Sequence, residues 1–498
     1  MANKNKFRIR LRKTLAAALA SLMIFQFTGC ASVMDLQGQT SSDISVSSYS
    51  ASAAVLGLSP HSEKVSSGVS SAASAASTYA SSATLVKQTA KTNVKTDVKT
   101  ISVSNDSFSP QTVQQKTITR NIAAAQSYSY VSPKDGYNSL KTQLQRTLYD
   151  LINEGVYKIS SSKSENGYYL AGDIYLIGKL SESQIVTTIQ AFFDDNPQVF
   201  WITNSYSYAY NGNSTYFRMY SYLSANDCNS AISTLNSKIQ AAVEAMPSGL
   251  SEFDREEYIF DYIVKNCSYD NAAVADQTGR WQSFTVYGAL SGGTAVCEGY
   301  SKAMQLLCCY AGLKCMVTQG TASNVRHMWN AVDIDGSWYY LDVTWCDGNF
   351  VIYNYFNIPE SVLKKTHIIA PLASSLTESQ IEAGNQFNLS LPQCNSTKEN
   401  YYNVKGIKVS NTDSSGDSAV VSSIESGLKS GQTAFTFLVS GSGGYDAEVK
   451  SLLESKPYKI NTYFYEALQA CGYVPQNSKI SYVEDKDNSG LNIKVALS

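Results

Sequence analysis

The chain has 498 residues, a formal net charge of −2 at pH 7 and only 16% charged side chains. At about 150 residues per domain, this length predicts roughly three domains. The near-neutral charge supplies no basic field, so we expect no nucleic-acid partner. With few charges and 34 tyrosines, much of the polar surface must come from Ser, Thr, Asn and Tyr, a composition common in exported proteins.

The N-terminus is typical of a lipoprotein leader. MANKNKFRIRLRK carries six basic residues, and an apolar run at 14–27 follows it. That run is shorter than the ~20 apolar residues of a transmembrane helix and fits the apolar core of a signal peptide. It ends at Thr28-Gly29-Cys30, which resembles a bacterial lipobox. We therefore expect a signal peptide at 1–29 and lipidation of Cys30. The alternative is an ordinary signal peptide in which Cys30 is incidental.

Residues 30–129 are dominated by Ser, Ala, Thr, Val and Lys and contain few aromatic residues. Such a segment cannot bury enough apolar surface to offset the entropy lost on ordering. We interpret it as a disordered tether. It would carry the folded part away from the membrane and into contact with a cell wall. The expected location is thus extracytoplasmic, with a lipid anchor in the cell membrane.

Residues 130–250 have the pattern of a small α+β region. Apolar residues recur at helical spacing in 139–155 and 181–197. The segment 198–224 alternates aromatic and polar residues about an Asn-Gly pair, which is typical of a hairpin. A further helix is expected at 225–247, where it ends at a proline.

The C-terminal region, 398–498, predicts a second small α+β domain. Its strand-like segments are KGIKVS, QTAFTFLVS and NIKVALS, and its helical segments are AEVKSLLES and NTYFYEALQACG. No motif in this region suggests chemistry, and its role is left open.

The segment SEFDREEYIFDYIVKN at 251–266 predicts a helix whose apolar face is formed by Ile259, Tyr262 and Ile263. Asp254 and Glu257, three residues apart, resemble a capping box near its start.

The stretch GGTAVCEGYSKAMQLLCCYAG at 292–312 holds three of the ten cysteines. Cys297 follows a Gly-Gly-Thr turn and opens a predicted helix. There the helix dipole and the unpaired N–H groups favour a thiolate and suit a developing oxyanion. Cys308 and Cys309 lie three turns further along and are interpreted as packing residues. A redox role for that pair is a weaker alternative, because the chain has no C-x-x-C motif.

A thiol nucleophile needs a base, and the chain has three histidines. His61 lies in the tether and His367 near the end of the central region, where a surface or edge position is favoured over a supporting role in a site. His327 begins HMWNAVDIDGSWYYLDVTW, which predicts a β-hairpin about Asp335-Gly336.

A two-residue loop in this hairpin pairs Ile334 with Ser337 and therefore His327 with Thr344. Asp342 then becomes the diagonal neighbour of His327 on the same face, within reach of its side chain. Alternation along the strands places this face away from the core. The hairpin thus brings an imidazole and a carboxylate together.

Cys297, His327 and Asp342, in this order on a helix and then a hairpin, resemble the transglutaminase-like superfamily. The text that carries the resemblance is GGTAVCEGYSKAMQLL and RHMWNAVDIDGSWYYLDVTW, with DREEYIFDYIVKNCSYD and FTVYGAL before them. It covers about 250–370, and the region before it looks like the extension found in exported bacterial members.

The resemblance implies an α+β fold with a papain-like core, in which the nucleophile helix packs on an antiparallel sheet, at 251–375. It implies Cys297 as nucleophile, His327 as general base and acid, and Asp342 as the group that orients His327. Neither a metal nor an organic cofactor is implied. The sequence departs from the family after Asp342: the family often has Trp followed by an acidic residue, whereas here Cys346 intervenes in DVTWCDG. Gln282 is considered as a side-chain oxyanion donor, but a solvated Gln is favoured.

The hypothesis is a cell-surface thiol enzyme that crosslinks or hydrolyses amide bonds of a protein or peptide substrate. The alternative is a non-catalytic, wall-associated binding or assembly protein that keeps these residues as part of its scaffold.

Overall fold

The computed structural model describes residues 133–369 and 391–497, apart from 277–278, 324, 349, 457 and 476–477, and the backbone of a two-residue strand, β1 (Ala53–Ala54). Contacts divide the described residues into two compact units: the first contains the described residues up to 240, and the second contains those from 241 onward together with β1. The predicted leader, Cys30 and His61 lie outside the described residues. Among the described helices, none is long and apolar enough to cross a membrane.

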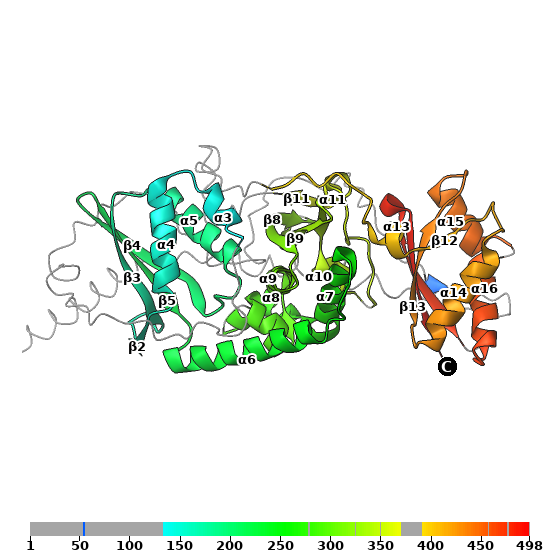
Figure 1. The fold of residues 1–498 in the computed structure, drawn as a ribbon, viewed down its shortest axis with the longest axis horizontal. Coiled ribbons are helices and arrows are strands. Elements are labelled where there is room, and N and C mark those ends of the chain that lie inside the picture. The colour runs from blue at the N-terminus through cyan, green and yellow to red at the C-terminus, as the bar shows by residue number, and fades with distance from the viewer. Residues whose placement is uncertain are drawn as a thin grey trace, which may run out of the picture. The chain divides into compact units, whose positions relative to one another are not determined.

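The first unit is built on a four-stranded antiparallel sheet in the order β2-β3-β5-β4, with helices beside it (Figure 1). The helices and the hairpin predicted here are confirmed, and the hairpin loop is Gly212-Asn213, because Asn211 pairs with Ser214. The elements are α3 (Asp135–Ser139), α4 (Gln143–Gly155), β2 (Ile159–Lys163), β3 (Tyr169–Ile177), α5 (Glu182–Asp195), β4 (Ile202–Asn211), β5 (Ser214–Ser221) and α6 (Ala225–Glu244).

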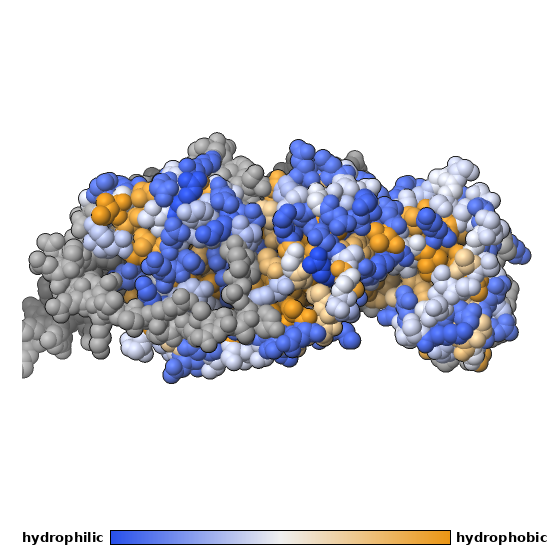
Figure 2. Space-filling model, viewed as in Figure 1, coloured by the Kyte–Doolittle hydropathy of each residue, from blue (hydrophilic) through white to orange (hydrophobic). Residues whose placement is uncertain are grey.

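Local sequence explains where the helices of this unit begin. Thr142 and Ser181 each cap a helix, and a glutamine three residues later completes the capping box in both cases. Along α6, one buried residue is followed by two or three less buried ones, so the helix presents a polar outer side, blue to pale in Figure 2.

The second unit contains a four-stranded antiparallel sheet in the order β10-β9-β8-β11. Helix α9 packs on β8 and β9, and α7 packs on α9. The elements are α7 (Glu252–Asn266), β6 (Ser268–Tyr269), α8 (Asn271–Ala275), η3 (Trp281–Phe284), η4 (Gly288–Gly292), β7 (Thr294–Ala295), α9 (Cys297–Tyr310), β8 (Lys314–Ala322), β9 (Val325–Ile334), β10 (Ser337–Leu341), α10 (Val343–Cys346), α11 (Glu360–Leu363) and β11 (His367–Ile369).

The predicted hairpin register is confirmed: Ile334 pairs with Ser337. Asp335 and Gly336 have φ of 51° and 77°, as a type I′ turn requires at both central positions. The expected pairing of His327 with Thr344 is wrong. Strand β10 ends at Leu341, and the chain then turns into α10.

The expected capping box in α7 is also wrong. The helix begins one turn earlier, because Ser251 is the N-cap and its side chain accepts a hydrogen bond from the Asp254 amide at 3.0 Å. Serine is among the preferred N-cap residues. The predicted apolar face is confirmed at Ile259 and Ile263, which are buried, whereas Tyr262 is only partly buried.

The C-terminal part of this unit is a five-stranded sheet in the order β1-β14-β15-β13-β12, in which only β12 and β13 are parallel. The predicted strands and helices are present, and α13, α14 and β14 were not predicted. The elements are α13 (Tyr401–Lys405), β12 (Ile407–Val409), α14 (Asp417–Lys429), β13 (Ala434–Val439), α15 (Tyr445–Glu454), α16 (Lys459–Ala470), β14 (Lys479–Asp485), η6 (Lys486–Asn488) and β15 (Gly490–Ala496).

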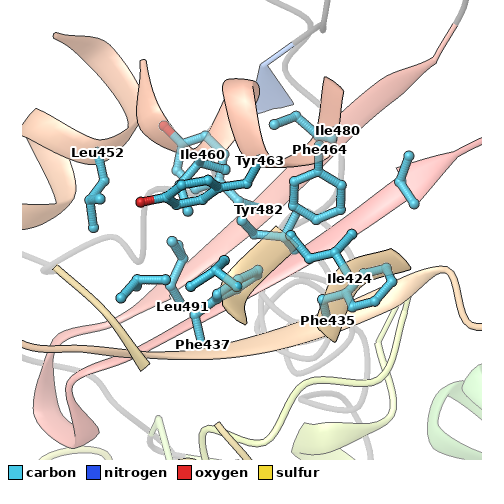
Figure 3. Close-up of a cluster of buried hydrophobic side chains, with 14 of the residues drawn as sticks. Ile424, Phe435, Phe437, Leu452, Ile460, Tyr463, Phe464, Ile480, Tyr482 and Leu491 are labelled. Atoms are coloured by element: carbon cyan, nitrogen blue, oxygen red, sulfur yellow. The ribbon is translucent and has the colours of Figure 1, made fainter. Parts of the chain in front are cut away.

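The core of this part lies between the sheet and its helices (Figure 3). Phe464 on α16 packs edge-on against Phe435 and Phe437 on β13, with ring centroids 5.5 and 6.2 Å apart. Ile424 and Leu491 are fully buried in the same cluster. Aromatic and branched side chains of this kind supply most of the stabilisation of a small domain.

A buried carboxyl in α7 predicts a pH-dependent stability. Glu256 is fully buried; its Oε2 accepts a 2.6 Å hydrogen bond from Asn357, and its Oε1 has no hydrogen-bond partner among the described residues. Burial raises the pKa of Glu256 from 4.5 to about 8, against the lowering effect of the Asn357 hydrogen bond.

Between these two pH values the unfolded chain ionises while the folded chain stays protonated, so stability is full below pH 4.5 and falls as the pH rises to about 8. Glu256→Gln removes this titration. We therefore expect the midpoint of thermal unfolding to fall less between pH 5 and pH 8.5 in the variant than in the unchanged protein. If the midpoint falls equally with pH in both proteins, the raised pKa of Glu256 is contradicted.

Candidate active site

Cys297 is the first residue of α9 and is fully buried. The N-cap before it, Val296, has extended backbone and offers no side-chain cap to the first turn. The Val296 amide donates instead to the Ser283 carbonyl at 2.9 Å, which ties the start of α9 to η3. The first amides of a helix have no partner within the helix, and the dipole there favours a negative charge. This setting matches the one expected for Cys297.

A glycine makes the approach of η3 to α9 possible. A Cβ on Gly299 would lie 2.9 Å from the carbonyl oxygens of Ser283 and Thr285, and 2.7 Å from the Cβ of Ala295. These separations are shorter than real Cβ contacts allow, so the position excludes any other residue without a shift of the backbone. The 283–285 segment is thereby held beside the first turn of the nucleophile helix.

Cys297 forms a small buried cluster with Val317 of β8 and Met328 of β9. The helix start therefore contacts the sheet next to His327. The eight other described cysteines are free thiols. Because the thiolate is the nucleophilic form of cysteine, any chemistry at Cys297 requires the reduced protein.

His327 and Asp342 are brought together. His327 Nε2 lies 2.6 Å from Asp342 Oδ2, and Asp342 Oδ1 accepts the Trp345 amide at 3.1 Å as the N-cap of α10. Burial alone would raise the pKa of Asp342, but its interactions with His327 first and with His367 second outweigh burial and hold that pKa below its usual range. The ionised carboxylate only accepts, so Nε2 of His327 donates to it; in the neutral tautomer that donates from Nε2, Nδ1 is the acceptor.

The alternation along the hairpin suggested that this pair faces away from the core. The structure shows instead that the pair is buried. His327 is only 7% exposed and Asp342 only 1%. The rings of Trp329 and Trp345 each lie 5.9 Å from the His327 ring, centroid to centroid. Aromatic side chains thus cover the face of the sheet that carries His327.

His367 belongs to the site, and the surface position favoured from the sequence is wrong. It lies on β11, which is an edge strand as expected, but it is only 1% exposed. Its Nε2 lies 3.1 Å from Asp342 Oδ2, the same oxygen that bonds His327. The nitrogen and oxygen atoms of His327, Asp342 and His367 lie within 4.8 Å of one another, as a set of metal ligands would.

The other residues considered from the sequence do not join this cluster. Gln282 is exposed on η3, as the favoured interpretation held. Cys346 is buried at the end of α10. Burial, together with the Cys315 thiol beside it, raises the pKa of Cys308. Cys308 is therefore an inert buried thiol, which argues against a redox pair with Cys309.

Comparisons with known proteins agree with these features. Residues 240–343 match the family model of the transglutaminase-like superfamily. The kyphoscoliosis peptidases of Homo sapiens and Mus musculus are 29% and 28% identical to the chain over 110 residues, which cover 20% of this chain. The same residues cover only 16% of each peptidase, so the chain matches a small part of these relatives.

Solved structures give weaker matches. A crystal structure of a TGase covers 34% of this chain and 50% of its own, with 16% identity and a TM-score of 0.21. A structure described as a candidate cysteine protease from Cytophaga hutchinsonii covers 32% and 58%, with 14% identity and a TM-score of 0.20. Together with the helix α9 on its antiparallel sheet, the family match confirms the expected α+β class and the expected resemblance. Residues 240–343 of the chain are thus similar to the transglutaminase-like superfamily.

Proposed function

We propose that this domain is a thiol enzyme in which Cys297 is the nucleophile, His327 the general base and acid, and Asp342 the group that orients His327. The observation that carries the proposal is the 2.6 Å bond between His327 Nε2 and Asp342 Oδ2, on the strand whose next residue, Met328, contacts Cys297. The superfamily match supports a thiol enzyme in general terms. The substrate would be a side-chain carboxamide or a peptide bond of a protein or peptide.

The reaction would proceed in two steps. Nδ1 of His327 takes the proton of the Cys297 thiol, and the thiolate attacks the carbonyl carbon. The amides at the start of α9 would stabilise the oxyanion. His327 then returns the proton to the leaving amine, and a thioester remains on Cys297. In the second step an amine or water, deprotonated by His327, attacks the thioester and releases the thiol. Asp342 stabilises the imidazolium in both steps without taking its proton.

The first prediction concerns the reactivity of Cys297. After reduction and removal of the reductant, we expect iodoacetamide to label Cys297 fast at pH 6, because a thiolate paired with His327 persists well below the ordinary thiol pKa of ~8.5. His327→Ala should slow this labelling about 10- to 100-fold, since the thiol then returns toward ordinary behaviour. Mass spectrometry of the labelled peptides across pH 4 to 9 measures both.

Cys267 provides the internal control. It is buried like Cys297, and burial raises its pKa to about 12. It should stay unlabelled over the same pH range. Labelling of Cys297 no faster than that of Cys267 would contradict the proposed nucleophile.

The alternative of a non-catalytic scaffold predicts a different result in the cell. An intact His327–Asp342 pair favours an enzyme, because a scaffold has no need of a buried carboxylate bonded to imidazole. Cys297→Ala changes little volume at a packed helix start, so the protein should fold, and we expect its cellular role to be lost. If that role survives unchanged, the enzyme hypothesis fails and a binding or assembly function replaces it.

We also propose that the protein acts outside the cytoplasm, held at the membrane by a lipid on Cys30 and in contact with the cell wall. The basic and apolar N-terminal stretches and Thr28-Gly29-Cys30 support this. Cys30→Ala should move the protein from the membrane fraction to the soluble or secreted fraction, as fractionation and immunoblotting would show. An unchanged membrane fraction would rule out the lipid anchor.

A further inference from the structure

We propose that His367 is a positioning residue of this site: its imidazole is a second donor to Asp342 that keeps the carboxylate ionised and fixed toward His327. The inference rests on the proposed function, because it gives His367 a part in the same thiol chemistry. Neither the sequence motif nor the family match, which ends at residue 343, includes His367.

The first step is the set of donors around Asp342. Oδ2 is approached by His327 Nε2 at 2.6 Å and by His367 Nε2 at 3.1 Å, while Oδ1 accepts the Trp345 amide at 3.1 Å. The Asp342 side chain is fully buried. A buried carboxylate is tolerated only where hydrogen bonds replace water, and His367 supplies one of these three bonds.

The second step is the orientation of His367 itself. Its Nδ1 lies 2.8 Å from the Thr366 hydroxyl, which also receives the Tyr355 hydroxyl at 3.3 Å. The ring of Trp345 lies 4.7 Å away, centroid to centroid, and that of Trp329 lies 4.9 Å away. The backbone of His367 pairs with Ala322 of β8. The imidazole is therefore held on every side, with Nε2 directed at Asp342.

The third step is the protonation state. Burial lowers the pKa of His367, against the raising effect of Asp342, so the ring is neutral near pH 7. A neutral ring that donates from Nε2 keeps an acceptor at Nδ1, which suits the Thr366 hydroxyl as donor. His367 thus contributes a dipole and a hydrogen bond to Asp342 without adding a full charge beside His327.

The same three residues could instead be arranged to hold a divalent metal ion. A metal would need the lone pairs of both Nε2 atoms, and both rings would then carry their protons on Nδ1. Separations of 2.6 and 3.1 Å to one carboxylate oxygen are those of N–H donors, and they favour hydrogen bonds over ligation. The test below includes the metal as an outcome.

The experiment measures iodoacetamide labelling of Cys297 in the reduced full chain. A hydrogen bond to a charged group is worth about 10- to 100-fold in an equilibrium. His367→Leu should therefore slow labelling at pH 6 by about that factor and move the rise of the labelling profile to higher pH. His367→Gln, whose amide N–H can reach the position of Nε2, should stay within about threefold of the unchanged protein.

Ile368→Ala is the matched control. Ile368 is the next residue on β11 and is 60% exposed, so its loss tests damage to the strand without touching Asp342. It should leave the labelling rate unchanged. Equal rates in His367→Leu and the unchanged protein would overturn the inference, and so would a His367→Gln variant that is folded but as slow as His367→Leu.

Failure of the proposed function gives a different result. Iodoacetamide would then not label Cys297 fast at pH 6 even in the unchanged protein, and the positioning role of His367 would be contradicted as well. A second measurement does not depend on reactivity. Because the chain has only three histidines, ¹⁵N-histidine NMR should resolve His367 and show its proton on Nε2. A proton on Nδ1 would overturn the inference, because Nε2 would then have no hydrogen to donate to Asp342 and would instead have a lone pair free for a metal ion.

Discussion

The site depends on one buried carboxylate. Asp342 carries a negative charge in a place without solvent, and that costs several kcal/mol unless donors replace water. Its donors come from three separate segments: His327 on β9, His367 on β11 and the Trp345 amide at the start of α10. A strand pairing, a hairpin register and a helix cap must therefore all be in place before the charge is stabilised. Stabilisation of the Asp342 charge therefore depends on the same pairings that order the sheet.

Cys297, the proposed nucleophile, is positioned by a different kind of interaction, the close approach of backbone segments. Gly299 lets the carbonyls of Ser283 and Thr285 come beside the first turn of α9, and the Val296 amide is fixed to Ser283. The start of α9 is held by main-chain contacts and has no side-chain cap. A side-chain cap would compete with the substrate for the same amides. An uncapped start is therefore what an oxyanion site requires, at some cost in helix stability.

Local patterns predicted the half of the site that is local in sequence. The Asp335-Gly336 turn fixes the register of the hairpin as far as Leu341, and Asp342 meets His327 just beyond this point, as the N-cap of α10. Cys297 at a helix start follows from the Gly-Gly-Thr turn and the apolar spacing behind it. These features depend on residues that are close together in the sequence, and local sequence patterns predict such features well.

His367 could not be found in this way. It reaches Asp342 only because the three-residue strand β11 pairs with β8, a contact between distant parts of the chain. A strand of three residues is too short to show an alternating pattern in the sequence. A histidine close to Lys364 and Lys365 is therefore expected at the surface. The same limit explains α14, rich in serine, and the start of α7, where Ser251 supplies a better cap than Asp254. Burial of the His327–Asp342 pair was also misjudged, because the aromatic layer over it comes in part from Trp345, beyond the end of β10.

That aromatic layer bears on how the base would work. Trp329, Trp345 and Tyr355 surround the two imidazoles and leave Asp342 with no exposed surface on its side chain. Interactions between charges strengthen as water is removed, so each hydrogen bond to Asp342 counts for more here than at a surface. A carboxylate fixed in this way can hold one ring nitrogen of His327 at constant orientation through both steps of acyl transfer. The second imidazole makes this possible, because a single histidine could not satisfy the oxygen that both rings share.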